Sequence, residues 1–238
     1  MKNKKIILVI PAYNEEKSIV STVNTIIDYN KKNNANLDYV VINDGSKDNT
    51  KKILEDNNIN YINLVMNLGI GGAVQTGYKY AYENNYDIAI QYDGDGQHDV
   101  NYVDDLVEPI IKENADMTIG SRFIIKTKDG FKSSKARRIG INIISFFIKL
   151  KTKKKIYDVT SGFRAINRNL MKEYIAYYPI EYPEPISSVD AIKKDYNIVE
   201  VPVVMKERKN GKSSISSWKN IYYMINVLLS IILMKGKK

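Results

Sequence analysis

Short, mostly apolar runs alternate with longer stretches of mixed polarity over the first half of the chain. Near-continuous apolar runs of this length are typical of strands that are buried on both faces of a parallel sheet. The pattern predicts four such strands, at residues 6–10, 37–42, 59–64 and 88–92. Helices are expected between them, including one at 50–57 and one that ends near residue 85. This order predicts an α/β fold with a mostly parallel sheet flanked by helices.

Polar residues and glycines follow each of the four predicted strands. AYNEE follows the first strand, NDGS the second, NLGIGG the third and DGDGQ the fourth. In open α/β sheets, ligands bind beyond the carboxyl ends of the strands. We therefore expect these four loops, which are far apart in the sequence, to converge on one site.

A looser pattern continues through the second half of the chain. The expected elements are a strand at 117–120, a helix at 139–150, helices around 169–177 and up to about 196, and a strand at 198–205. They should add antiparallel or mixed strands to the sheet. We expect one domain over residues 1–215, built from the halves 1–120 and 121–215, and a separate C-terminal helix within 216–238.

The C-terminal segment is apolar from residue 221 to 234. A helix of that length spans roughly 20 Å, which is shorter than the ~30 Å hydrocarbon core of a bilayer. Its polar residues Lys219, Asn226, Ser230 and Lys237 fall on one helical stripe. This pattern favours an amphipathic helix that lies in the membrane interface. The alternative is a helix that packs on its own domain or on a partner subunit.

Composition limits the chemistry of the candidate site. The chain has 238 residues, no cysteine and a single histidine, His98. A thiolate metal site and a multi-histidine zinc site are therefore excluded, and a Ser-His-Asp triad is not expected. A metal in this protein would be a hard cation bound by oxygen ligands.

The net charge of +9 favours anionic partners. Basic residues concentrate at 132–155 and at 206–238, where they flank apolar segments. That arrangement suits an anionic membrane surface, and we do not expect a nucleic-acid partner. The N-terminal residues also lack the apolar run of a signal peptide, which predicts a cytoplasmic protein peripheral to the cytosolic face of the membrane.

Asp93 and Asp95, in the motif QYDGDGQHD, are the strongest candidates for metal ligands. Residues two apart at the end of a strand point to the same side, and the glycines allow a tight turn. Two carboxylates this close repel each other unless a cation lies between them. Gln97 is a candidate neutral oxygen ligand. The alternative is a solvated Asp-Gly turn.

Glycines at 69, 71 and 72 give a weak signal for phosphate binding. The segment lacks both the Lys-Ser/Thr pair of a P-loop and the spacing of a dinucleotide-binding loop. A tight turn into a helix explains these glycines equally well, with Gly77 allowing that helix to pack closely on the sheet.

Seven motifs, in order over almost the whole chain, resemble family 2 glycosyltransferases. The motifs are VIPAYNEE (9–16), VVINDGSKDNT (40–50), NLGIGGAVQTG (67–77), QYDGDGQHD (91–99), GSRF (120–123), DVTSGFRAINR (158–168) and EVPVVMKERKNGKSSI (200–215). They are most similar to the dolichol- and polyprenyl-phosphate sugar synthases. The resemblance implies a GT-A fold and a hexosyltransferase that inverts the anomeric carbon. It further implies a UDP- or GDP-sugar donor and a Mg²⁺ or Mn²⁺ ion, with the donor in 1–120 and the acceptor in 121–215.

The resemblance also implies roles for particular residues. Residues expected to bind the donor are Pro11, Ala12, Tyr13, Glu15, Asp44, Gly71, Asp93, Arg137 and Arg138, with Asp44 contacting the base. Residues expected to bind the metal are Asp93, Asp95 and Gln97. Residues expected around the reacting phosphates are Asp158, Arg122, Arg164, Arg208 and Lys212. This chain has Asn43-Asp44 where many family members have two aspartates.

Simpler explanations exist for several of these residues. Arg122 and Arg164 could pair with carboxylates, and Tyr13 could be a core aromatic residue. Arg137, Arg138, Arg208 and Lys212 could be ordinary surface charges.

The acceptor determines whether the reaction needs a general base. A polyprenyl phosphate is already anionic and needs only positioning. A hydroxyl of a lipid-linked or capsular glycan needs a carboxylate base, for which Asp158 and Glu184 are the candidates. The remaining alternative is a scaffold that binds nucleotide-sugar without transfer. In each case a small membrane-protein subunit is a possible partner.

Overall fold

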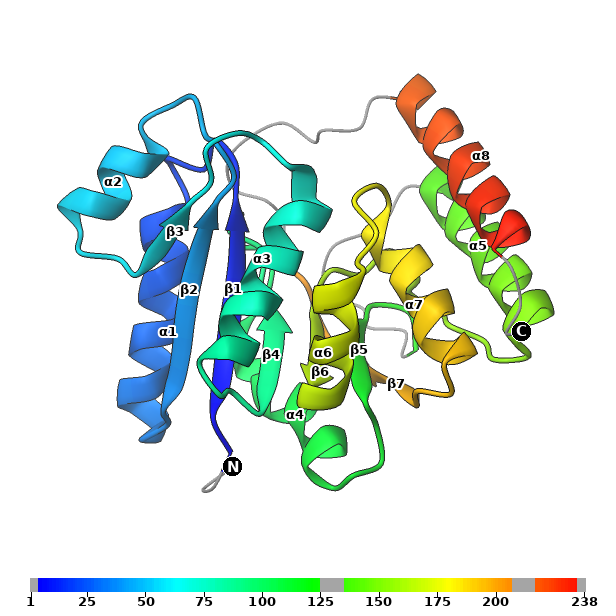
Figure 1. The fold of residues 1–238 in the computed structure, drawn as a ribbon, viewed down its shortest axis with the longest axis horizontal. Helices are drawn as coiled ribbons and strands as arrows, with labels where there is room; N and C mark the ends of the chain where they lie inside the picture. Colours follow the sequence, from blue (N-terminus) through cyan, green and yellow to red (C-terminus); the bar gives the residue numbers. More distant parts are fainter. Residues whose placement is uncertain (1–3, 125–134, 207–216, 235–238) are drawn as a thin grey trace.

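The computed structural model describes residues 4–124, 135–206 and 217–234. Its centre is one seven-stranded sheet in the order β3-β2-β1-β4-β6-β5-β7 (Figure 1). The strands are β1 Ile6–Ala12, β2 Leu37–Asn43, β3 Tyr61–Asn63, β4 Ile88–Gln91, β5 Met117–Ser121, β6 Arg164–Asn167 and β7 Ile198–Pro202. The mostly parallel α/β architecture predicted from the sequence is confirmed.

Helices cover both faces of the sheet. The helices are α1 Ile19–Asn33, α2 Thr50–Asp56, α3 Gly69–Glu83, α4 Val103–Ile111, α5 Lys135–Thr152, α6 Arg168–Ala176, α7 Pro183–Lys193 and α8 Ser217–Leu233, with a short 3₁₀ helix at Val100–Tyr102. Side chains of α1, α2 and α4 enter one core, and side chains of α3 and α5–α8 enter the other. Along β1, Leu8 belongs to the first core and Val9 to the second, as expected of a strand buried on both faces.

Strand β6 is the element that the hydrophobic pattern did not predict. It pairs antiparallel with both β4 and β5, in the interior of the sheet. The strand has only four residues and begins with Arg164, so it gives no apolar run that would distinguish it from the surrounding motif. Because β6 pairs with β4, the loop before β6 lies close to the loop after β4, which contains Asp93.

The C-terminal helix α8 has two different apolar faces. Val227 and Ile231 are fully buried against the second core. Figure 1 shows α8 alongside α5, and α8 also contacts α7. Ile225 and Leu229 are about half exposed. One face of α8 therefore packs on its own domain, which was the alternative expected from the sequence. The role of the other face in the membrane interface stays a prediction.

Two lysines fix the end of α8 against the domain. Lys151 of α5 donates a hydrogen bond to the carbonyl of Ile232 at 2.8 Å, and Lys193 of α7 donates to that of Met234 at 2.7 Å. Positive charge is favourable at a helix C-terminus, where carbonyl groups lack helical partners. Among the described residues, no helix is both long and apolar enough to cross a membrane.

Gly77 allows α3 to lie directly on the sheet, as the sequence suggested. A β-carbon at this position would overlap the side chain of Val9 in β1. We predict that Gly77→Ala lowers the free energy of unfolding by about 1–3 kcal/mol, because overpacking forces neighbouring atoms to move. Denaturant unfolding measures the change. Lys79→Ala, on the exposed side of the same helix, should stay within about 0.5 kcal/mol of the unsubstituted protein. Equal stability of the two variants would contradict the packing role of Gly77.

Candidate active site

The loops after β1 and β2 are joined by direct hydrogen bonds. Asn14 has a left-handed backbone conformation with φ 57°, and its side-chain oxygen accepts a bond from the Lys47 amide at 2.8 Å. The Asn14 amide donates to Ser46 Oγ at 3.0 Å, and the Glu15 amide donates to Thr50 Oγ1 at 2.9 Å. The predicted convergence of the loops at the carboxyl ends of the strands is therefore present for this pair.

Asp44 connects the loop after β2 to the start of α3. Its side chain is 3% exposed, and Oδ1 accepts a hydrogen bond from the Leu68 amide at 2.7 Å. Burial raises the pKa of Asp44, while the amides of Leu68 and Gly69 oppose that shift. A structural role for this carboxylate is thus evident, and its contact with a nucleobase stays a prediction.

The other residues expected to bind the nucleoside lie at the same edge of the sheet. Pro11 and Ala12 end β1 in buried positions, whereas Tyr13 is 41% exposed and so is not a core aromatic residue. Gly71 lies in the first turn of α3, where an added β-carbon would lie 2.6 Å from the carbonyl oxygen of Ile180. Close packing of two backbones therefore explains this glycine without a phosphate.

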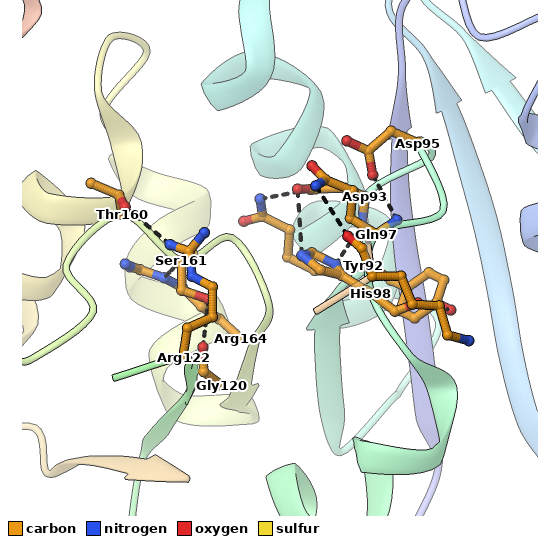
Figure 2. A network of polar contacts seen from close by, with 12 residues as sticks. Tyr92, Asp93, Asp95, Gln97, His98, Gly120, Arg122, Thr160, Ser161 and Arg164 are labelled. Atoms are coloured by element: carbon orange, nitrogen blue, oxygen red, sulfur yellow. Dashed lines mark hydrogen bonds and ion pairs between the residues drawn. The ribbon is translucent and has the colours of Figure 1, made fainter. Parts of the chain in front are cut away.

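Asp93 is positioned by its neighbours in the loop after β4 (Figure 2). Its amide donates a hydrogen bond to His98 Nδ1 at 3.0 Å, and its Oδ1 accepts one from Gln91 Nε2 at 3.3 Å. His98 is 4% exposed and stacks on Phe163 with ring centroids 4.6 Å apart. Burial lowers the pKa of His98 to about 4, so the ring is neutral at pH 7 and orients Asp93 without forming an ion pair with it.

Asp95 and Gln97 continue the same loop. Asp95 Oδ1 accepts a hydrogen bond from the Gln97 amide at 3.0 Å. The side chain of Gln97 donates to the carbonyl of Lys206 at 3.3 Å, and the Lys206 amide donates back to the carbonyl of Gln97 at 2.9 Å. These bonds tie the loop to the segment that follows β7. Arg208 and Lys212, both predicted near the phosphates, lie outside the described residues.

The loop contains a donor set that suits a hard cation. Within the described ranges there is no group of three or more His, Cys, Asp or Glu side chains arranged to hold a metal ion. Mg²⁺ is commonly bound by only one or two carboxylates, with substrate phosphates and water as the other ligands. Asp93 and Asp95 fit that type of site.

Arg122 and Asp158 form a buried bidentate ion pair. Arg122 Nε and Nη2 each lie 2.7 Å from a carboxylate oxygen of Asp158, and the Arg122 amide donates to Oδ2 at 3.0 Å. The Asp158 side chain has no exposed surface, and that of Arg122 is 9% exposed. Arg122 therefore pairs with a carboxylate, as the simpler explanation of this residue proposed. Asp158 is fully engaged as its counter-ion, which makes it unsuited to act as a base.

Arg164 is buried and surrounded by oxygen atoms. Its guanidinium donates to the carbonyls of Ser161 at 2.6 Å and Glu184 at 2.7 Å, and also to Val159, Ser187 and Ser188. Only 1% of the residue is exposed. These acceptors are all carbonyl and hydroxyl oxygens, so the first role of Arg164 is to hold the loop 158–163 and the start of α7 together.

The loop 158–163 approaches Asp93 through a glycine. A β-carbon at Gly162 would lie 2.8 Å from Gln91 Nε2 and 3.1 Å from Asp93 Oδ2. Glu184, which is partly buried, interacts with the same pair: burial raises its pKa, a hydrogen bond from Gln91 opposes the shift, and the charge of Asp93 adds to it. Figure 2 shows the loop carrying Thr160 and Ser161, with Arg122 and Arg164, opposite the Asp93 loop.

Arg137 and Arg138 begin α5 beside the Arg122–Asp158 pair. The guanidinium of Arg138 lies over the Phe123 ring, 3.6 Å from its centroid. Partial burial and the positive charge of Arg122 lower the pKa of Arg137. Both arginines therefore add positive charge on the side of the site that faces α5.

Three residues that shape the site, Gln91, His98 and Gly162, were not predicted from the sequence. The position of His98, three residues after Asp95 in DGDGQHD, is a signal that the sequence contains. Gly162 in TSGFR is a second signal, since glycine allows the backbone to approach neighbouring groups closely.

Comparison with known proteins agrees with this geometry. The model of the family Glycosyl transferase family 2 matches residues 7–175. A UDP-N-acetylglucosamine–dolichyl-phosphate N-acetylglucosaminyltransferase of Methanococcus voltae is 35% identical over 223 residues, covering 85% of this chain and 86% of the relative. An undecaprenyl-phosphate mannosyltransferase of Micrococcus luteus is 27% identical, with 89% and 88% covered.

Solved structures share the fold. Glucosyl-3-phosphoglycerate synthase from Mycobacterium tuberculosis, in complex with Mn²⁺, UDP-glucose and phosphoglyceric acid, superposes with a TM-score of 0.72 at 16% identity. The match covers 98% of this chain and 82% of the synthase. The sheet and its helices thus form a GT-A fold, and the chain belongs to glycosyl transferase family 2 and is a glycosyltransferase.

Proposed function

We propose that the protein transfers a sugar from a UDP- or GDP-sugar to a polyprenyl phosphate, with inversion at the anomeric carbon and with Mg²⁺ or Mn²⁺. The observation that carries the proposal is the pair Asp93 and Asp95 facing a wall rich in arginine. The proposal is supported by relatives whose names specify dolichyl-phosphate and undecaprenyl-phosphate acceptors. The synthase of similar fold binds Mn²⁺ and UDP-glucose.

Asp93 and Asp95 would hold the metal, with Gln97 nearby. When bound, such an ion neutralises charge that develops on the departing nucleoside diphosphate. His98 and Gln91 keep Asp93 in one orientation through hydrogen bonds of 3.0 and 3.3 Å. A carboxylate that is already oriented needs little rearrangement when the reaction begins.

Positive charge on the opposite wall would bind phosphate groups. Asp158 pairs with Arg122, and Arg137 and Arg138 at the start of α5 are proposed to add positive charge to this wall. Arg208 and Lys212 are proposed to add to it from the segment after β7. A phosphate acceptor bound there is already anionic near neutral pH and attacks without a general base.

Glu184 supports a second candidate function, transfer to a hydroxyl of a lipid-linked or capsular glycan. A hydroxyl must lose its proton as it attacks, and the raised pKa of Glu184 suits a general base. Asp158 is a poor candidate because Arg122 binds both of its oxygens. The basic wall favours the phosphate acceptor.

An exposed apolar platform is proposed to bind the cytosolic face of the membrane. We define the platform as Ile139, Phe146 and Leu150 of α5 with Ile225, Leu229 and Ile232 of α8, each between 48% and 64% exposed. Lys149 and Lys153 are exposed beside it and would attract anionic headgroups. A small membrane-protein subunit is the alternative partner for the platform.

For the proposed function, the first prediction is that the purified protein moves label from one UDP- or GDP-sugar into polyprenyl phosphate, and only when Mg²⁺ or Mn²⁺ is present. Organic extraction separates the lipid product from the donor. Tight binding of one donor without transfer to any acceptor would instead support a non-catalytic nucleotide-sugar-binding scaffold.

The second prediction concerns the metal ligands. Asp95→Asn should lower transfer at least about a hundredfold, because the carboxylate no longer balances the cation. Titration calorimetry with UDP present should show weaker Mn²⁺ binding. Asp105→Asn, on the exposed surface of α4, is the matched control. Full transfer by Asp95→Asn with unchanged metal dependence would exclude the metal assignment.

The third prediction concerns the platform. Phe146→Glu combined with Leu229→Glu should weaken binding to phosphatidylglycerol-containing vesicles at least about tenfold, since two apolar side chains no longer enter the bilayer. Val65→Glu combined with Met66→Glu places the same two charges on exposed apolar residues that lie outside the platform. Vesicle flotation compares the variants. Equal loss in the control, or no loss in the double variant, would count against the platform.

A further inference from the structure

The buried side of α8 reaches the start of α7. The Tyr223 ring meets the Tyr182 ring edge-on, with centroids 4.7 Å apart and planes at 89°. Asn226, one turn further along α8, donates its side-chain N–H to the Tyr182 hydroxyl at 3.5 Å. Edge-to-face aromatic pairs are favourable beyond the area they bury. Two side chains of the last helix therefore hold one residue that precedes α7.

That residue has an unfavourable backbone conformation. Tyr182 is the N-cap of α7 and has φ 53° and ψ 48°, in the left-handed region. Bulky side chains rarely occur with this backbone conformation, which persists only where surrounding contacts impose it. Pro183 follows directly and fixes the first turn of the helix. The contacts from α8 thus help to set where α7 begins.

The first turn of α7 forms part of the site. The carbonyl of Glu184 accepts a hydrogen bond from Arg164 at 2.7 Å, and Arg164 also donates to the carbonyl of Ser161. The adjacent Gly162 lies against Asp93. The Glu184 side chain is also close enough to this loop for the charge of Asp93 to affect its pKa. A continuous series of contacts therefore runs from α8 through Tyr182 and Arg164 to the candidate metal ligand.

We propose that Tyr223 and Asn226 are positioning residues for the transfer reaction. They hold Tyr182 in its left-handed conformation, and thereby fix the wall made by the start of α7 and the loop 158–163. The C-terminal helix is then part of the catalytic unit as well as a surface for the membrane. This inference rests on the proposed function, because it assigns α8 a role in the same reaction.

The test separates positioning from membrane attachment. Transfer is measured in detergent with a short-chain, water-soluble prenyl phosphate, so that vesicle binding does not limit the rate. Tyr223→Ala should lower kcat at least about tenfold while the KM for the donor and the Kd for UDP stay within about twofold, because a displaced wall impairs the reacting geometry. Tyr223→Phe keeps the ring and should retain at least about half of kcat.

Two further variants make the result specific. Asn226→Ala removes only the bond to the Tyr182 hydroxyl and should lower kcat about threefold. Tyr222→Ala removes the neighbouring tyrosine, which is 67% exposed, and should leave kcat in detergent unchanged. Wild-type kcat in both Tyr223→Ala and Asn226→Ala would overturn the proposal. A parallel loss of kcat and UDP affinity would overturn it too, because that result indicates general unfolding.

Hydrogen exchange tests the same inference without an acceptor. Amides at 183–188 should exchange faster in Tyr223→Ala than in Tyr223→Phe or Tyr222→Ala, while those of β1 and β4 stay protected. Unchanged exchange at 183–188 would refute the coupling. If the unsubstituted protein transfers no sugar to lipid phosphate, the proposed function fails, and the exchange data still decide whether α8 controls the start of α7.

Discussion

The buried guanidinium of Arg164 is the interaction on which the second half of the site depends. A charge removed from water is costly unless its hydrogen bonds are satisfied, and five protein oxygens accept bonds from this group. They belong to the loop 158–163 and to the first two turns of α7. Because Arg164 begins β6, which lies between β4 and β5, the same residue is anchored in the centre of the sheet.

The site has two walls that differ in charge: the loop after β4, and the loop 158–163 together with the start of α5. On the wall after β4, neutral His98 accepts a hydrogen bond from the backbone amide of Asp93 and Gln91 donates one to its carboxylate, so the negative charge of this loop lies at Asp93 and Asp95. On the opposite wall, Asp158 forms an ion pair with Arg122, and Arg137 of α5 lies close enough to interact with both. Under the proposed function, a nucleoside diphosphate with its metal and an anionic acceptor would both meet complementary charge between these walls.

The sequence predicted the elements whose signal is local. The first four strands are short, mostly apolar runs, and the loop after the fourth carries the candidate metal ligands. Strand β6 was missed because its pairing depends on residues far along the chain and not on its own four residues. The pattern of α8 predicted an amphipathic helix with one polar stripe, but periodicity does not show that Val227 and Ile231 face the domain's own core. Side-chain partners such as Asp158 for Arg122 and His98 for Asp93 likewise follow from tertiary contacts.

The choice of acceptor tests the account most directly. Equal amounts of polyprenyl phosphate and the corresponding polyprenol would compete for one labelled donor in detergent with Mg²⁺, over about pH 7.5 to 9. The account predicts that label enters the phosphate alone, at a rate nearly independent of pH, because the acceptor is already ionised in this range. Transfer to the polyprenol at a comparable rate would contradict it and would point to base catalysis by a residue such as Glu184.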